Sequence, residues 1–219
     1  MKIYKNVIFD LDGTLLDTAE DLADSVNFAL ASSCMKARSL EEIKLFVGNG
    51  VANLISLSVP AGTSDTARER VFSDFKLHYA GNIANKTKPF DGIIELLELL
   101  KVHSIGVAIS SNKYQEGVND LCERYFKGLY TVAFGERQGI ARKPDPSIVF
   151  TAIDILLAKA EETLYIGDSE VDGQTAKNAG IDFLGVSWGL RPVELLIESG
   201  AIAIANAPKD IVRFFYPSL

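Results

Sequence analysis

Short runs of apolar residues recur along the chain, and each run ends in a glycine, serine, aspartate or asparagine. Residues of these types favour turns and loops, so each run ends where a strand should give way to a loop. The runs are continuously apolar instead of alternating with polar residues, which is typical of strands buried on both faces of a sheet. The predicted strands cover residues 7–10, 104–111, 131–135, 164–168, 182–189 and 201–206.

Patterns typical of helices lie between these runs. The segment 92–101 reads GIIELLELLK, and the segment 146–157 begins at Pro146, a residue that suits the first turn of a helix. A third helix is predicted over 172–180, where Gly180 supplies a stop. Strands that alternate with helices predict an α/β fold with a doubly wound, parallel, Rossmann-like sheet.

Residues 16–88 interrupt this alternation, because they contain no convincing buried strand. Apolar residues recur there at helical spacing, and the segment is too long for an ordinary loop between a strand and a helix. We therefore predict an all-helical subdomain at 16–88, inserted into an α/β core formed by 1–15 and 89–219. Its helices are predicted around Leu22, Val26 and Leu30, in two pieces of 41–57 separated by a Gly48-Asn49-Gly50 turn, and over 66–84.

The overall charge restricts the classes of partner. The chain has 22 Lys and Arg against 29 Asp and Glu, a net charge of −7, and no basic tract, so we expect neither a nucleic-acid nor a membrane partner. Its two cysteines, Cys34 and Cys122, form neither a disulfide framework nor a metal-ligand spacing. No apolar run reaches the roughly 18 residues of a membrane span, and no signal-peptide pattern precedes the first acids. We expect a reduced, cytoplasmic protein that is a monomer or a homodimer.

Side chains that can bind phosphate or a metal gather where the predicted strands end. Because the carboxyl ends of parallel strands lie at one edge of a sheet, residues from distant parts of the chain should meet there. They are Asp10, Asp12, Gly13 and Thr14 after the first strand, Ser111 and Asn112 after the second, Asp168 and Asp172 after the fourth, and Lys143 just before helix 146–157.

This set of side chains favours phosphoryl transfer. Several carboxylates in one cleft repel one another unless a hard divalent cation such as Mg²⁺ binds them. One carboxylate can then attack phosphorus, and a second can protonate the leaving oxygen and later activate water. Hydroxyls, backbone N–H groups and Lys143 would stabilise the transferring phosphoryl group, which Gly13 would allow the backbone to approach closely.

Four motifs in this set resemble those of the haloacid dehalogenase superfamily of phosphatases, in the same order along the chain. They are DxDGT at 10–14, a serine followed by asparagine and lysine at 111–113, KPxP at 143–146 and GDSxxD at 167–172. Together the four motifs are far more specific than DxDGT alone, and the resemblance covers essentially the whole chain. It implies that the insert at 16–88 is a cap that closes over the site.

The resemblance also implies a role for each motif residue. Asp10 would be the nucleophile, Asp12 the general acid and base, and Lys143 would neutralise the nucleophile and the phosphate. An acid at the position of Asp12 favours phosphoryl chemistry over dehalogenation, because a halide leaving group needs no proton. The implied Mg²⁺ ligands are Asp10, Asp12 through its backbone carbonyl, Asp168, and Asp172 through water or as a supporting anchor. The implied substrate ligands are Gly13, Thr14, Ser111 and Asn112.

The segment FVGNG at 46–50 resembles the glycine-bearing cap loop of phosphoglycolate phosphatase-like members of the superfamily, and SWG at 187–189 resembles a later segment of the same group. On this resemblance Gly48, Asn49 and Gly50 would contact the substrate. The alternative is a plain turn between two helices.

Other interpretations stay open for single residues. Asp168 and Asp172 could cap the helix that follows them, and Lys113 could be a solvated surface lysine. His78 and His103 have no partner motif, so we expect them to be structural or exposed.

For the whole chain we expect Mg²⁺-dependent hydrolysis of a small phosphorylated metabolite through an aspartyl-phosphate. The alternatives are a β-phosphoglucomutase-like phosphotransferase, a pyrophosphatase and a catalytically silent interaction module. The mutase class carries basic residues in its cap loop, where this chain has glycine and asparagine, and the complete set of acids argues against a silent module.

Overall fold

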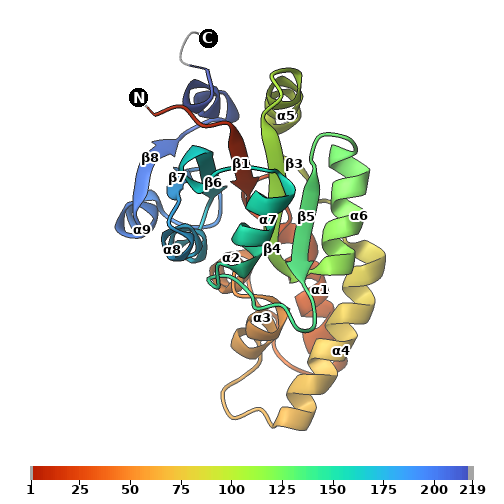
Figure 1. Ribbon diagram of the computed structural model, residues 1–219. Helices are drawn as coiled ribbons and strands as arrows, with labels where there is room; N and C mark the ends of the chain where they lie inside the picture. Colours follow the sequence, from red (N-terminus) through yellow and green to blue (C-terminus); the bar gives the residue numbers. More distant parts are fainter. Residues whose placement is uncertain (1, 217–219) are drawn as a thin grey trace.

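The computed structural model describes residues 2–216, and its main element is a six-stranded sheet (Figure 1). The strand order is β5-β4-β1-β6-β7-β8, and every adjacent pair of strands is parallel. The strands are β1 (Asn6–Phe9), β4 (Gly106–Tyr114), β5 (Val132–Glu136), β6 (Thr163–Gly167), β7 (Asp182–Val186) and β8 (Ala201–Ala205). The predicted parallel α/β sheet is confirmed.

Two strand ends differ from the prediction by three residues, and the other ends differ by two residues or fewer. Strand β4 continues to Tyr114 instead of ending at residue 111, because its pairing with β5 shifts in register after Ser110 and resumes where Tyr114 lies opposite Glu136. Strand β7 ends at Val186 instead of residue 189, because the chain turns there and carries Gly189 against the side chain of Asp168. A Cβ at Gly189 would overlap that carboxylate. Both differences therefore lie at the edge of the sheet where the candidate site was predicted.

Helices cover both faces of the sheet, as the doubly wound prediction requires. Val7 and Phe9 of β1 belong to one buried apolar cluster, and Ile8 between them belongs to the other. This alternation follows from the two-residue period of a strand, which turns successive side chains to opposite faces. The covering helices are α5 (Ile93–Val102) and α6 (Gln115–Phe126) on the first face, and α7 (Ser147–Ile155), α8 (Glu170–Ala179) and α9 (Val193–Glu198) on the second.

Strand β1 lies at the centre of the sheet, between β4 and β6. Phe9 at its end pairs with Ile109 of β4 and with Ile166 of β6, so the residues that come next along the three chain segments lie side by side. The backbone N–H of Asp10 donates to the carbonyl of Ile166 over 2.9 Å. In a doubly wound sheet this switch in strand order opens a crevice at the carboxyl ends.

The insert leaves the core directly after the first turn and faces the carboxyl ends of the strands (Figure 1). Its two connections to the core pair as an antiparallel ribbon, in which Leu16 lies opposite Pro89. The elements of the insert are β2 (Leu16–Asp17), α1 (Ala19–Ser32), α2 (Leu40–Phe46), α3 (Val51–Ser58), α4 (Asp65–Asn82) and β3 (Lys88–Pro89). The predicted helical insert is confirmed, whereas the domain boundaries at 15/16 and 88/89 stay a prediction.

Helices α1 and α4 pack against each other and form the body of the insert. The return to the core after α4 is held by Asp21 of α1, a buried carboxylate. Asp21 accepts hydrogen bonds from the backbone N–H groups of Lys86 and Thr87 at 2.8–3.0 Å. The buried apolar residues at helical spacing are Leu22, Val26 and Leu30 on α1, and Val71, Phe75 and Tyr79 on α4.

Within residues 2–216, the structure contains no helix long and apolar enough to cross a membrane. Helix α4 has 18 residues and carries charged side chains along its length.

Candidate active site

The turn after β1 brings the DxDGT motif into contact with the end of β6. Gly13 has a φ of +90°, a conformation that favours glycine. A Cβ at this position would overlap the carboxylate of Asp168, so no larger residue fits without movement. Thr14 is fully buried, and its hydroxyl donates to Oδ1 of Asp168 over 3.2 Å. The predicted contact of Thr14 with substrate stays a prediction, and its hydroxyl is positioned to orient Asp168.

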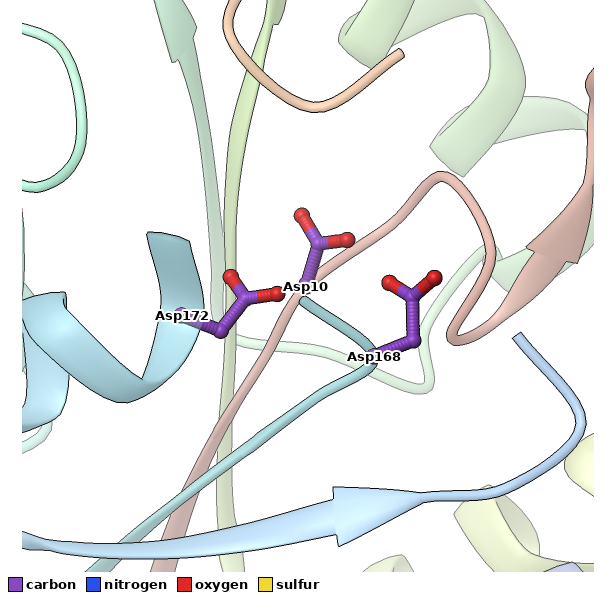
Figure 2. Close-up of side chains that lie close together, drawn as sticks. All are labelled: Asp10, Asp168 and Asp172. Atoms are coloured by element: carbon purple, nitrogen blue, oxygen red, sulfur yellow. The ribbon is translucent and has the colours of Figure 1, made fainter. Parts of the chain in front are cut away.

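Three carboxylates from separate elements meet at this edge of the sheet. Asp10 follows β1, Asp168 follows β6 and Asp172 lies in the first turn of α8 (Figure 2). Each offers an oxygen within 4.8 Å of the others, and all three residues are buried. Burial and the neighbouring charges raise the pKa of Asp10 well above its usual value, although Lys143 opposes the shift. Burial and the charge of Asp172 raise the pKa of Asp168 to about 7.

Lys143 bridges two of these carboxylates from the core side. Its Nζ lies 2.7 Å from Oδ1 of Asp10 and 2.7 Å from Oδ1 of Asp172, and donates to the backbone carbonyl of Ser110 over 3.0 Å. Burial works against its charge, but the two carboxylates outweigh burial and hold the pKa of Lys143 well above its usual value. Asn112 fixes the backbone of Lys143 by accepting from its N–H over 2.9 Å and donating to its carbonyl over 3.2 Å.

Asp172 serves two structural purposes at once. Its Oδ2 accepts from the hydroxyl of Ser169 over 2.6 Å and from its N–H over 3.1 Å, which completes the capping box of α8. Its Oδ1 accepts from Lys143 and, over 3.3 Å, from the hydroxyl of Tyr165. The capping role considered from the sequence is therefore present. Because both oxygens are engaged by the protein, the geometry favours Asp172 as the anchor of Lys143 over a direct metal ligand.

The donor set fits a hard divalent cation. Three carboxylates face a single lysine at the cluster, so negative charge is left uncompensated. Burial, and after it this surplus of negative charge, raises the pKa values of Asp10 and Asp168. Mg²⁺ prefers oxygen ligands and binds through one or two carboxylates while keeping waters and substrate oxygens. Asp10 and Asp168 would hold it, together with the backbone carbonyl of Asp12.

Asp12 belongs to a second polar cluster beside the first. Its Oδ1 lies 2.8 Å from Nζ of Lys113, and its Oδ2 accepts from the hydroxyl of Ser111 over 3.3 Å. Lys113 also donates to the hydroxyl of Tyr79 on α4 over 2.8 Å. The side chain of Lys113 is only 3% exposed, so the interpretation as a solvated surface lysine is wrong. Burial disfavours its charge, yet Asp12 and Tyr79 outweigh burial and raise the pKa of Lys113.

The loop at Gly48–Gly50 lies over the site and is held by core side chains. Asn112 donates to the carbonyl of Gly48 over 2.9 Å, and Arg142 donates to that of Asn49 over 3.4 Å. Arg191, which the sequence did not single out, donates to the carbonyls of Lys44 and Val47 at 2.8 and 2.5 Å. It also pairs with Glu170 over 3.0 Å. Its only sequence signal is its place just after the SWG segment, because backbone carbonyl partners leave no trace in a sequence.

A pocket opens between the core carboxylates and the insert. Its core side consists of polar residues, including Asp10, Asp12, Ser111, Lys143 and Asp168. Its insert side consists of Leu22, Val47, Gly48, Gly50, Val51 and Leu54. The polar residues that could bind phosphate and the apolar, glycine-bearing side of the insert therefore face each other across one cavity. Contact of Gly48, Asn49 and Gly50 with substrate stays a prediction.

The chain matches the family model of haloacid dehalogenase-like hydrolases over residues 7–186. Among curated proteins it is similar to the phosphoglycolate phosphatase of Mesorhizobium japonicum, 36% identical over 84% of this chain and 82% of the relative. It is also similar to the phosphoglycolate phosphatase of Thiobacillus denitrificans, 32% identical over 95% and 96% of the two chains.

Among solved structures, a candidate phosphoglycolate phosphatase from Lactobacillus delbrueckii superposes with a TM-score of 0.92. It is 35% identical, and the match covers 98% of this chain and 99% of that one. The family-model match and these relatives agree with the four motifs gathered at one edge of the sheet. The chain therefore belongs to the haloacid dehalogenase-like hydrolases and is a phosphatase similar to the phosphoglycolate phosphatases.

Proposed function

We propose that the protein hydrolyses a small phosphomonoester of the phosphoglycolate type, with Mg²⁺, through an aspartyl-phosphate. The observation that carries the proposal is the buried contact of Lys143 with Asp10, beside Asp168 and on the same side of the pocket as Asp12. A carboxylate in such a position can be a nucleophile, and the lysine compensates the negative charges of the carboxylate and of the bound phosphate.

In the first half-reaction, Oδ2 of Asp10 attacks phosphorus, since Lys143 contacts the other oxygen, Oδ1. A bond forms between Asp10 and phosphorus as the bond to the leaving oxygen breaks. Mg²⁺, when bound, supplies positive charge to the phosphoryl oxygens. The Ser111 hydroxyl and the backbone N–H groups near Gly13 would donate to the same oxygens. Asn112 contributes indirectly, because its amide holds Lys143 and Gly48.

Asp12 would carry the proton in both half-reactions. It donates a proton to the leaving oxygen as the ester bond breaks, so that an alcohol departs. It then accepts a proton from the water that attacks the phosphorus of the aspartyl-phosphate, which releases phosphate and restores Asp10. An acid is needed because an alkoxide is a poor leaving group.

The insert side of the pocket supports a small leaving group. Leu22, Val47, Val51 and Leu54 narrow the cavity and present apolar surface. The curated relatives named as phosphoglycolate phosphatases support the same choice of substrate class. A sugar phosphate or a second phosphate would need more polar partners than this wall provides, and this difference supports a phosphatase over the mutase and pyrophosphatase alternatives.

A panel of phosphoglycolate, other small phosphomonoesters, pyrophosphate and β-glucose 1-phosphate tests the proposal by measuring phosphate release. We expect turnover of a small ester with Mg²⁺, and loss of turnover with EDTA or excess Ca²⁺. Ca²⁺ accepts looser and higher coordination, so it would misplace the nucleophile. Full turnover in chelator would remove the metal from the proposal, and sugar-phosphate isomerisation without phosphate release would favour the mutase.

A further inference from the structure

Lys113 is a buried cation to which the proposed reaction gives no task. Its Nζ contacts Oδ1 of Asp12 over 2.8 Å and the hydroxyl of Tyr79 over 2.8 Å. The same nitrogen lies 4.9 Å from the centre of the Tyr79 ring, within the range of a cation–π contact. Lys113 is therefore shared between a residue of the DxDGT motif and a residue of the helical insert.

Tyr79 is held firmly in the insert. It lies on α4 with no exposed surface, stacks on Phe75 at 5.3 Å between ring centres and meets the ring of Tyr114 edge-on at 6.3 Å. A tyrosine packed on its ring faces has little freedom to move its hydroxyl. The position of that hydroxyl therefore follows the position of α4 relative to the sheet.

The side chain of Asp12 depends on Lys113 for its direction. Ser111 also donates to Asp12, but over 3.3 Å, and a hydroxyl contact of that length is weaker than a charged one at 2.8 Å. Ser111 is in addition proposed to turn to the phosphoryl oxygens. Lys113 is therefore the main group that orients the carboxylate of Asp12, and Tyr79 orients the ammonium group of Lys113.

We propose that Lys113 and Tyr79 are positioning residues that orient Asp12 toward the leaving oxygen, so that the insert governs the proton transfer and not the attack on phosphorus. The inference rests on the proposed role of Asp12 as general acid. It assigns Lys113 and Tyr79 to a different step from Lys143, whose Nζ makes its hydrogen bonds to core residues in the described part of the chain.

The chemistry of the leaving group separates these steps. An alkyl phosphate such as phosphoglycolate needs a proton on its leaving oxygen, whereas acetyl phosphate releases acetate, a stable anion, without one. The two substrates are similar in size. The ratio of kcat/KM on phosphoglycolate to kcat/KM on acetyl phosphate therefore reports on Asp12 as the acid, because kcat/KM covers the steps up to departure of the leaving group and excludes the later hydrolysis of the aspartyl-phosphate, which both substrates share. The ratio does not change with the fraction of enzyme that is correctly folded.

The test measures this ratio in Tyr79→Phe, Lys113→Met and Asp12→Asn. We expect Tyr79→Phe, which removes one hydroxyl and keeps the ring, to lower the ratio about 10-fold, and Asp12→Asn to lower it about 100-fold or more. Lys113→Met should fall between them. Tyr114→Phe is the matched control, because it removes a hydroxyl from the same aromatic group without touching Lys113, and should leave the ratio unchanged.

The outcomes separate the inference from the function on which it rests. A lowered ratio in Asp12→Asn with an unchanged ratio in Tyr79→Phe would overturn the link to the insert and leave the acid role of Asp12 in place. An unchanged ratio in Asp12→Asn would end the acid role itself, and the inference with it. Equal losses on both substrates in Tyr79→Phe would reduce Tyr79 to a packing residue.

Discussion

Two buried lysines each contact a carboxylate of the active site, and different parts of the molecule hold them. Lys143 contacts Asp10, Asp172 and the backbone of Ser110, all of which belong to the α/β core. Lys113 contacts Asp12 in the core and Tyr79 in the insert. The two side chains are equally buried, at 3% exposure each, so burial does not distinguish them.

The difference lies in what must be assembled before each lysine can act. The surroundings of Lys143 are complete once the parallel sheet and α8 have formed. The surroundings of Lys113 also require α4 to lie against the core. The side-chain contacts of Lys143 on the phosphate side are thus made within the core, whereas the leaving-group side depends on the insert, and substitutions on the two sides should have separable effects.

The largest expected effect comes from the core side, at Asp10. Asp10→Asn keeps the shape of the side chain and removes the charge of the nucleophile, so kcat should fall by at least about 10⁴-fold on phosphoglycolate and acetyl phosphate alike. Phosphate release under saturating substrate measures it. Asp154→Asn, an exposed position on α7, is the matched control and should retain full activity. Near-normal turnover by Asp10→Asn would remove Asp10 from the nucleophilic role.

Lys143→Met should lower kcat about 10²- to 10³-fold, again equally on both substrates, because the lost charge serves the phosphoryl group in either case. It also leaves two buried carboxylates without their cation, so the free energy of unfolding at neutral pH without Mg²⁺ should fall by about 3–5 kcal/mol. Urea unfolding in EDTA measures this loss. Lys127→Met, at the exposed C-cap of α6, is the matched control and should leave the stability nearly unchanged. A change in the substrate ratio with Lys143→Met would contradict the separation of the two sides.

The smallest effect is expected in the loop of the insert, at Gly50. Gly50 and Gly62 both have a φ of +81°, but a Cβ at Gly50 would lie 2.7 Å from Nη1 of Arg142, whereas a Cβ at Gly62 would meet nothing within 4 Å. Alanine at either position should cost about 1–3 kcal/mol of stability, because a positive φ is strained for any residue with a Cβ. Only Gly50→Ala should also change the relative kcat/KM among small esters, by about 10-fold, with unchanged Mg²⁺ dependence. An unchanged substrate profile would make residues 46–50 a plain turn.

Much of the fold could be predicted because its signals are local. Continuously apolar runs located all six strands of the main sheet, and helical spacing located α1 and α4 within a few residues. Strand ends were less accurate where tertiary contacts override propensity. The register shift in β4 and the turn of Gly189 against Asp168 depend on neighbours far away in the chain.

The residues of the candidate site also fall into two groups, those that the sequence predicted and those that only the structure revealed. The sequence by itself determined the carboxylates, the serine and Lys143, because parallel strands bring their carboxyl ends to one edge whatever the details of packing. Only the tertiary structure decided that Lys113 is buried and that Arg191 holds the loop of the insert. Lys113 meets a tyrosine 34 residues away, and Arg191 meets a backbone carbonyl 147 residues away. A lysine or arginine has a long, flexible side chain that can end in water or in an ion pair, so its role depends on which distant groups folding places within its reach.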